Sequence, residues 1–111
     1  MTNSRQKGAR GERELAEELR KYGYGDARRG QQYCGANGDA DVVGLPGVHI
    51  ECKRAEKLNI DAAMEQSIRD SKPGEIPIVT HRKNRKPWKV TLQLRDFLKM
   101  YRVCLKYGGE K

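Results

Sequence analysis

The sequence predicts a single α/β domain in which helices and strands follow one another along 111 residues. Segments with apolar residues three and four positions apart, typical of amphipathic helices, are interleaved with short segments rich in valine and isoleucine that are typical of strands. A chain of this length can bury one modest core and not two. The predicted order is helix, three strands, helix, two strands, helix, in one domain over residues 1–111 with a flexible tail at 1–6.

The first predicted helix runs from about residue 7 to residue 22. Leu15, Ala16 and Leu19 recur at three- and four-residue steps, which places them on one apolar face, and Gly23 then ends the helix. Glu12 lies three and four residues before Leu15 and Ala16 and therefore shares their inward face. An acid that merely favours the helix dipole is the alternative. The inward phase favours a functional carboxylate.

A short strand over residues 28–33 is predicted to precede two strands at 40–45 and 48–53. Leu45-Pro46-Gly47 suits a tight turn between the last two strands, because proline and glycine favour turn conformations. These two strands therefore form a hairpin, and the period-two alternation of a strand divides the second one into two faces. One face carries Val48, Ile50 and Cys52, and the other carries His49, Glu51 and Lys53.

The second half of the chain is predicted to contain a helix over 60–71, strands over 76–81 and 87–94, and a final helix over 95–107. The apolar side of the first of these helices carries Ile60, Ala63, Met64 and Ile68. The alternating residues expected to point inward from the last strand are Trp88, Val90, Leu92 and Leu94. The final helix either covers the core or pairs with a partner through Phe97, Leu98, Tyr101 and Leu105.

Charge narrows the class of partner. Lysine and arginine number 23 against 15 aspartates and glutamates, which gives a net charge of +8 and a pI near 9.6. Such a balance is typical of proteins that bind a polyanion, nucleic acid first. No apolar run approaches the ~20 residues of a membrane span, and the N-terminus lacks the apolar part of a secretory signal. We therefore expect a cytoplasmic protein with no membrane contact.

Cysteines and histidines do not predict a zinc site. Cys34, Cys52 and Cys104 are an odd number at wide spacings, so we expect reduced, mostly structural thiols. His49 and His81 are not at ligand spacing from each other or from a cysteine. No small-molecule cofactor is expected.

The predicted hairpin folds Asp41 back beside Glu51, so that two carboxylates converge. Two ionised carboxylates at short range repel each other unless a cation lies between them. Oxygen ligands with few imidazoles or thiolates favour Mg²⁺ or Mn²⁺ over Zn²⁺. Lys53 shares the face of Glu51 and can orient a nucleophile or offset developing negative charge. Phosphodiester hydrolysis needs these parts, and we expect Glu12, Asp41 and Glu51 to hold the metal directly or through water.

The segment from Asp41 through GLPGVHI to Glu51-Cys52-Lys53 resembles the PD-(D/E)XK nuclease motif, with Ala40 where that motif often has proline. Together with KGARGERELAEELRKYGY and the arginine-bearing loop, it is similar to the archaeal-type Holliday junction resolvases and their small phage-like relatives. The resemblance implies a restriction-endonuclease-like fold, a mixed β-sheet flanked by helices in α-β-β-β-α-β-β-α order. It also implies a homodimer, Mg²⁺-dependent cleavage of branched or junction DNA that leaves a 5′-phosphate, and a place in DNA recombination and repair.

The same resemblance extends the list of site residues. It places a helix glutamate and its neighbouring arginine at Glu12 and Arg13, and a loop arginine at Arg28 or Arg29. Asp39 is the nearest rival to Asp41, since it lies two residues earlier and would share the same face. Gln66 resembles a glutamine of related small nucleases, and an ordinary solvated helix residue is the equal alternative. Both are accessory candidates.

The segment HRKNRKPWK, residues 81–89, is a basic turn that suits contact with DNA phosphates. Trp88 is in phase with apolar residues of its strand, which favours a core position over base stacking. The residues expected to bind DNA are Arg10, Arg13, Arg28, Arg29, Arg82, Lys83, Arg85 and Lys86. Two alternatives to a resolvase stay open, namely a general or flap- or nick-specific phage nuclease and a non-catalytic DNA-binding protein on the same fold.

Overall fold

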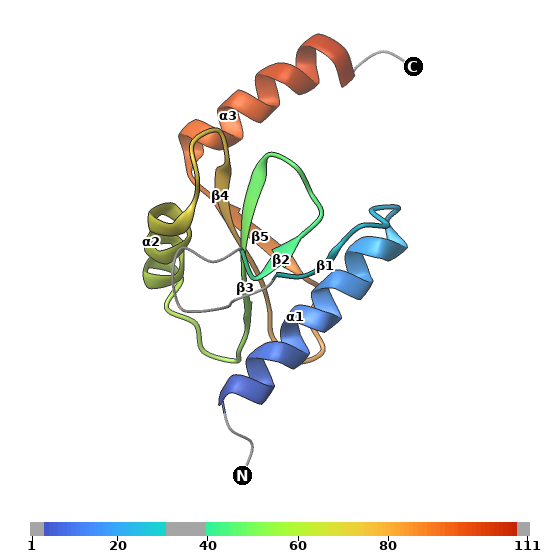
Figure 1. Ribbon diagram of the computed structural model, residues 1–111. Helices are drawn as coiled ribbons and strands as arrows, with labels where there is room; N and C mark the ends of the chain where they lie inside the picture. Colours follow the sequence, from blue (N-terminus) through green and yellow to red (C-terminus); the bar gives the residue numbers. More distant parts are fainter. Residues whose placement is uncertain (1–3, 31–39, 109–111) are drawn as a thin grey trace.

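The computed structural model describes residues 4–30 and 40–108, with side chains from residue 8 onward. Its elements confirm the predicted order and the restriction-endonuclease-like α/β fold, with the first helix beginning three residues earlier than expected (Figure 1). They are α1 (Ser4–Lys21), β1 (Arg28–Arg29), β2 (Val42–Val43), β3 (Val48–Arg54), α2 (Ile60–Asp70), β4 (Ile76–Arg82), β5 (Lys89–Leu92), α3 (Leu94–Val103) and the π-helical η1 (Cys104–Gly108).

The five strands form one mixed sheet in the order β1-β2-β3-β4-β5. β2 and β3 form the predicted antiparallel hairpin, with Val42 opposite Ile50. β3 and β4 are parallel along their whole length, from Val48 opposite Ile76 to Arg54 opposite Arg82. A parallel pair needs a crossover connection, which α2 supplies. β4 and β5 close the sheet as an antiparallel pair.

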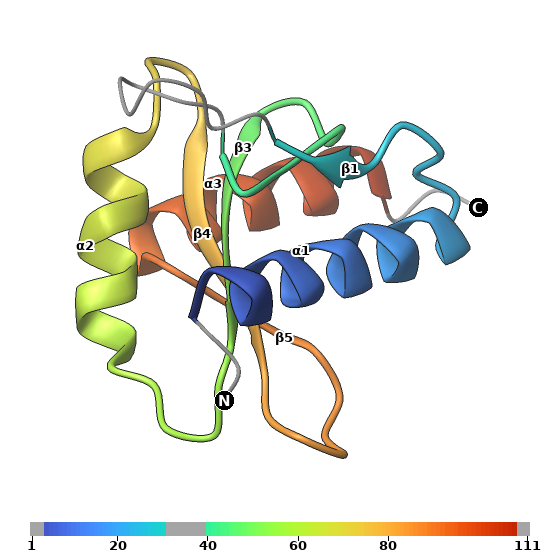
Figure 2. The same cartoon turned by 60° about the horizontal axis from the view of Figure 1, so that its bottom comes forward.

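The core lies on both faces of the two central strands. Leu15 and Ala16 of α1 pack against one face, which presents Ile50 and Ile78. Val79 is fully buried and points to the opposite face by strand alternation. Since α2 is the other helix in contact with β3 and β4, it covers that face, and Figure 2 shows the two helices flanking the strands.

Helix α2 is fixed at both its start and its buried side. The side-chain oxygen of Asn59 accepts a hydrogen bond from the backbone N–H of Ala62, as expected of an N-cap residue. The hydroxyl of Ser67 is fully buried and lies 3.2 and 3.0 Å from the carbonyl oxygens of His49 and Ile78. The prediction placed Ile68 on the buried side, and this was wrong, because the helix turns Ser67 toward the sheet and leaves Ile68 exposed.

Two inward positions predicted for the last strand are also wrong. Val90 and Leu94 are 56% and 70% exposed, whereas Trp88 and Leu92 are partly buried and pack against the core as expected. β5 is an edge strand, and α1, which packs on the face that Val90 shares with Leu92, makes its main contacts with β1, β2 and β3. Alternation therefore identified the strand and not its burial.

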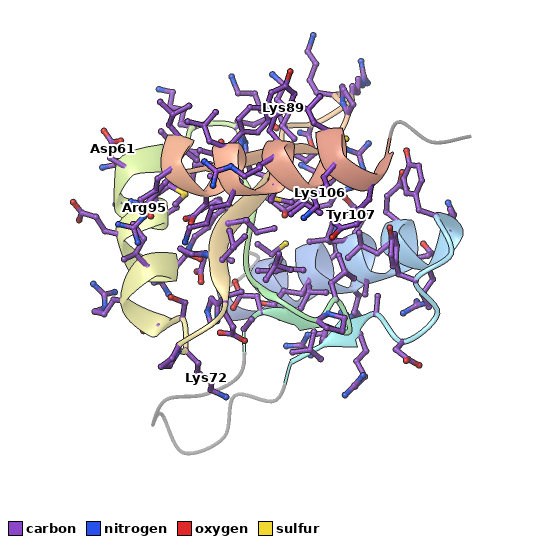
Figure 3. The ribbon with its side chains drawn as sticks, turned by 90° about the horizontal axis from the view of Figure 1, so that it is seen from above. Asp61, Lys72, Lys89, Arg95, Lys106 and Tyr107 are labelled. Carbon is purple, nitrogen blue, oxygen red and sulfur yellow. The ribbon has the colours of Figure 1, made fainter. Side chains whose placement is uncertain are left out.

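Helix α3 leaves the sheet after β5 and does not cover the core. Figure 3 looks down on it, with Arg95 near its start and Lys106 and Tyr107 near its end. The four apolar residues expected to pack from this helix all lie exposed, and among the described elements α3 makes its main contacts with η1. Of the two positions left open for this helix, the structure excludes the core-covering one. The four exposed apolar residues are Phe97, Leu98, Tyr101 and Leu105.

None of the described helices combines the length and apolar character that a membrane span requires. The two described cysteines are free, with Cys52 buried and Cys104 exposed, and Cys34 lies outside the described residues.

Gly44 joins the β2–β3 turn to the segment before β1, and its replacement tests this junction. Its φ is +111°, and a Cβ atom there would lie 2.5 Å from the carbonyl oxygen of Asp26. We expect Gly44→Ala to lower the free energy of unfolding by about 3 kcal/mol through strain and overlap. Gly8→Ala is the control, since a Cβ there meets nothing within 4 Å, and it should be neutral or stabilise by up to about 1 kcal/mol. Urea denaturation measures both, and equal effects would contradict the close approach.

Candidate active site

Asp41 is fixed at the edge of β3, directly before β2 begins. Its backbone N–H donates to the carbonyl oxygen of Ile50 at 2.9 Å, as the last bond of the hairpin. The next backbone donor along that edge, the N–H of Cys52, is bound by Oδ2 of Asp41 at 2.9 Å. The carboxylate thus takes the position of a missing strand, which satisfies a buried donor and determines where the carboxylate lies.

Glu51 lies on β3 between Ile50 and Cys52, the two residues whose backbone groups bind Asp41, and it is 3% exposed. Strand alternation directs its side chain away from the face that Ile50 and Cys52 present to α1. Lys53 shares the face of Glu51, as predicted, and its Nζ lies 3.5 Å from Oε2 of Glu51. The ammonium is about one third exposed, so the pair joins a buried acid to a cation that reaches solvent.

Glu12 reaches the same region from α1. Only 9% of its surface is exposed, which confirms the predicted inward orientation. Its Oε1 accepts a hydrogen bond of 2.9 Å from Nε of Arg29. The resemblance left the loop arginine open between Arg28 and Arg29, and the structure brings Arg29 to Glu12. Arg28 instead donates to the carbonyl oxygen of Asp26.

The electrostatics couple the three carboxylates through Asp41. Burial and the negative charge of Asp41 raise the pKa of Glu51 to about 7, and the charge of Lys53 opposes this shift. Burial also raises the pKa of Glu12, the hydrogen bond from Arg29 lowers it, and Asp41 raises it again. The charge of Asp41 therefore acts on both glutamates. Ionising all three carboxylates is unfavourable unless further positive charge is supplied.

The type of donor fits a hard divalent cation, since the converging ligands are carboxylate oxygens whose mutual repulsion such a cation relieves. Within residues 4–30 and 40–108, however, no three His, Cys, Asp or Glu side chains form a group that could hold a metal ion. Strand geometry gives the reason, because Glu12 and Glu51 approach β3 from opposite faces with Asp41 between them. The three carboxylates are therefore not arranged so that all of them could bind one metal ion directly. Glu12 would act at longer range or through water.

The accessory candidates and the histidines are placed as follows. Gln66 lies half-buried on α2, and Asp39 falls outside the described residues. His49 is buried with Nδ1 3.3 Å from Oε1 of Glu75, and Nε2 of His81 lies 2.9 Å from the hydroxyl of Thr91. Both imidazoles thus have side-chain partners of their own, as expected of non-ligating histidines.

Basic side chains gather in two hollows beside the site. One, of about 470 Å³, lies between α1 and β1, and its arginines are Arg10, Arg13, Arg20, Arg28 and Arg29. The other, of about 210 Å³, lies at the β4–β5 turn, and its basic residues are His81, Arg82, Lys83, Lys86 and Lys89. Arg29 connects the first hollow to Glu12.

Sequence analysis missed two of these cations, Arg20 and Lys89. Arg20 lies seven residues after Arg13, which is two helical turns, so helical spacing alone could have placed it on the arginine-bearing face. Arg85, which was predicted to bind DNA, lies exposed in the same turn with a φ of 60° and does not line the hollow.

The raised pKa of Glu51 predicts how stability depends on pH. A carboxyl group that titrates at about 7 in the folded state and 4.5 in the unfolded state binds more protons when folded, so its ionisation destabilises the fold as pH rises between these values. We expect the free energy of unfolding of Glu51→Gln minus that of the wild type, both in EDTA, to increase by about 3 kcal/mol from about pH 5 to about pH 8. Urea denaturation at both pH values measures this. Glu18→Gln on α1 is the control, and an equal gain there would contradict the assignment.

Comparison with known families gives the fold and the site a context. The sequence profile of a family described as "Phage putative PDDEXK endonuclease" matches residues 3–107. No curated protein and no solved structure matches the chain significantly. The matched range takes in every element from α1 to α3 and includes Asp41, Glu51 and Lys53. The chain therefore belongs to the phage putative PDDEXK endonuclease family.

Proposed function

We propose that this protein is a Mg²⁺- or Mn²⁺-dependent DNA endonuclease with Asp41, Glu51, Lys53 and Glu12 as its active site. The observation that carries the proposal is the position of Asp41. Its carboxylate is fixed on the edge of β3, and its charge acts on two buried glutamates from different elements. A fold gains no stability from assembling like charges in a buried place, so the arrangement favours a function that brings in a cation.

The roles of the side chains follow from their positions. Asp41 and Glu51 are the direct metal ligands, and a bound Mg²⁺ or Mn²⁺ would polarise the scissile phosphate and lower the pKa of a bound water. Lys53 holds its ammonium beside Glu51, where it orients the attacking water or offsets negative charge on the phosphate. Glu12, held by Arg29, adds negative charge to the metal site through water.

DNA is the substrate that a nuclease of this family implies, and the two basic hollows support it. Arg10 and Arg13 are exposed on α1, and the cations of the β4–β5 turn lie beyond the other end of the site. Such contacts bind the backbone without reading sequence, so they suit recognition by DNA shape.

Replacement of the metal-binding carboxylates tests the activity. We expect Asp41→Asn and Glu51→Gln each to lower the cleavage rate by at least about a hundredfold, because they remove the charge that holds the cation. DNA affinity, measured by fluorescence anisotropy, should stay within about twofold, since neither residue supplies a phosphate contact. Glu18→Gln is the matched control and should cleave normally. EDTA should abolish cleavage by the wild type.

Cleavage at the wild-type rate by both variants would exclude this site. A wild type that binds DNA and cuts none with either Mg²⁺ or Mn²⁺ would favour the alternative, a non-catalytic DNA-binding protein on the same fold.

We further propose that the enzyme acts as a homodimer on four-way junctions, as a Holliday junction resolvase. A resolvase makes paired cuts, which requires two active sites in one assembly. The exposed apolar face of α3 supports pairing between copies, because helices of this length are stabilised mainly by packing. Phe97 and Tyr101 stack on this face with ring centroids 6.0 Å apart. A general or flap- or nick-specific phage nuclease fits the family equally well.

Substrate geometry and assembly are tested together. We expect sedimentation velocity to give twice the monomer mass of 12.7 kDa, and a panel of four-way, flapped, nicked and linear DNA to show paired cuts in the junction. Leu98→Glu introduces a charge into the α3 face and should yield a monomer that cuts one strand at a time. A monomeric wild type that prefers flapped, nicked or linear DNA would contradict the resolvase and favour the alternative.

A further inference from the structure

Two arginines from neighbouring strands meet on one glutamate of α1. Oε1 of Glu14 accepts hydrogen bonds of 3.0 Å from Nε of Arg54 and 3.0 Å from Nη1 of Arg82. Arg54 ends β3 and Arg82 ends β4, and the parallel register places these residues side by side. The carboxylate of Glu14 therefore holds two guanidinium groups together at one end of the sheet.

Further contacts fix the position of both side chains. A Cβ atom at Gly11 would lie 2.8 Å from Cβ of Arg54, so α1 approaches β3 here as closely as only glycine permits. Nε of Arg82 donates to the carbonyl oxygen of Lys86 at 2.6 Å, and its guanidinium lies 6.0 Å from the ring centroid of Trp88. Holding flexible side chains in place before a ligand arrives removes much of the entropy loss on binding.

Most of the guanidinium donors remain available. Each arginine has five N–H donors, and Arg54 uses Nε alone for a hydrogen bond within the described residues. Its Nη1 lies 4.0 Å from Oε2 of Glu56, too far for a hydrogen bond. Within the described residues, Asp96 carries the one buried side-chain N or O atom that has no hydrogen-bond partner. The donors of Arg54 and Arg82 that have no partner are therefore not buried and reach solvent.

We propose that Arg54 and Arg82, positioned by Glu14, form a binding site for a phosphate of the DNA backbone outside the active site. Two planar guanidinium groups side by side match the oxygens of a phosphate, and arginine binds phosphate in this bidentate manner. Lys83, Lys86 and Lys89 line the adjoining hollow and extend the positive surface. We call this the arginine-pair site, comprising Glu14, Arg54 and Arg82.

The location gives the site a function in the reaction. Arg54 directly follows Lys53, so β3 carries both the active-site ammonium and one arginine of the arginine-pair site. A strand of DNA held at the arginine pair would be oriented relative to the scissile phosphate. This role rests on the proposed nuclease function, whereas the binding of phosphate does not require it.

The direction in which one substitution changes the affinity for DNA distinguishes a positioned binding site from an effect of net charge alone. Glu14→Gln and Glu18→Gln remove the same charge from the same helix, and by charge alone both should strengthen binding to DNA. Because Glu14 positions the pair, we expect Glu14→Gln to weaken binding by at least about fivefold, and Glu18→Gln to leave it unchanged or strengthen it by up to about twofold. Fluorescence anisotropy with a labelled four-way junction and a linear duplex, in EDTA, measures both.

Arg54→Lys and Arg82→Lys provide a second test that keeps the net charge. Lysine lacks the planar fork, so each variant should weaken binding by about the same factor as Glu14→Gln. Circular dichroism during thermal unfolding shows which variants fold. If Glu14→Gln does not fold, the two lysine variants alone test the site. Lys21→Arg, exposed at the end of α1, is the matched control and should bind as the wild type does.

Wild-type affinity in Glu14→Gln and in both lysine variants would overturn the arginine-pair site and leave the nuclease proposal intact. A wild type that fails to cleave, with variants that still lose affinity, would overturn the nuclease proposal and support the arginine-pair site as a DNA contact.

Discussion

The parallel pairing of β3 with β4 holds the rest of the structure in place. It extends over all seven residues of each strand, and α1 and α2 cover its two faces. A buried strand must have its backbone donors and acceptors paired on both edges. β4 provides this on one edge of β3, and β2 on the other only as far as Asp41. The unpaired stretch beyond β2 is where a carboxylate takes over, so the site lies where the sheet is incomplete.

Buried carboxylates at this edge oppose folding rather than support it. Burial raises the pKa of both glutamates, and Asp41 adds to each shift. Lys53 and Arg29 supply one cation to each glutamate, which lowers the unfavourable energy without removing it. Sites with a strained balance of charge are typical of catalytic centres, where a missing cation or a substrate completes the balance. The same imbalance thus underlies both the predicted pH dependence of stability and the proposed binding of a divalent ion.

Positive charge on this protein is of two kinds. Several arginines near the site are held by acceptors of the fold, among them Arg29 by Glu12 and Arg54 and Arg82 by Glu14. The lysines of the β4–β5 turn are exposed and make no ion pair among the described residues. Fixed guanidinium groups can orient a backbone, while mobile ammonium groups mainly add long-range attraction. The exposed apolar face of α3 lies apart from both, so the proposed contact between copies is separate from the proposed contacts with DNA.

The sequence alone determined the element order, the β2–β3 hairpin and the inward phase of Glu12, because helical periodicity, strand alternation and turn chemistry are local properties. It also indicated the grouping of Asp41, Glu51 and Lys53, since one short turn relates them. Tertiary structure decided which arginine meets Glu12, that α3 stays uncovered, and that Glu14 joins two strands. These depend on the register between β3 and β4 and on the seating of α1, which are set by packing between residues distant in the chain, and no local pattern encodes them.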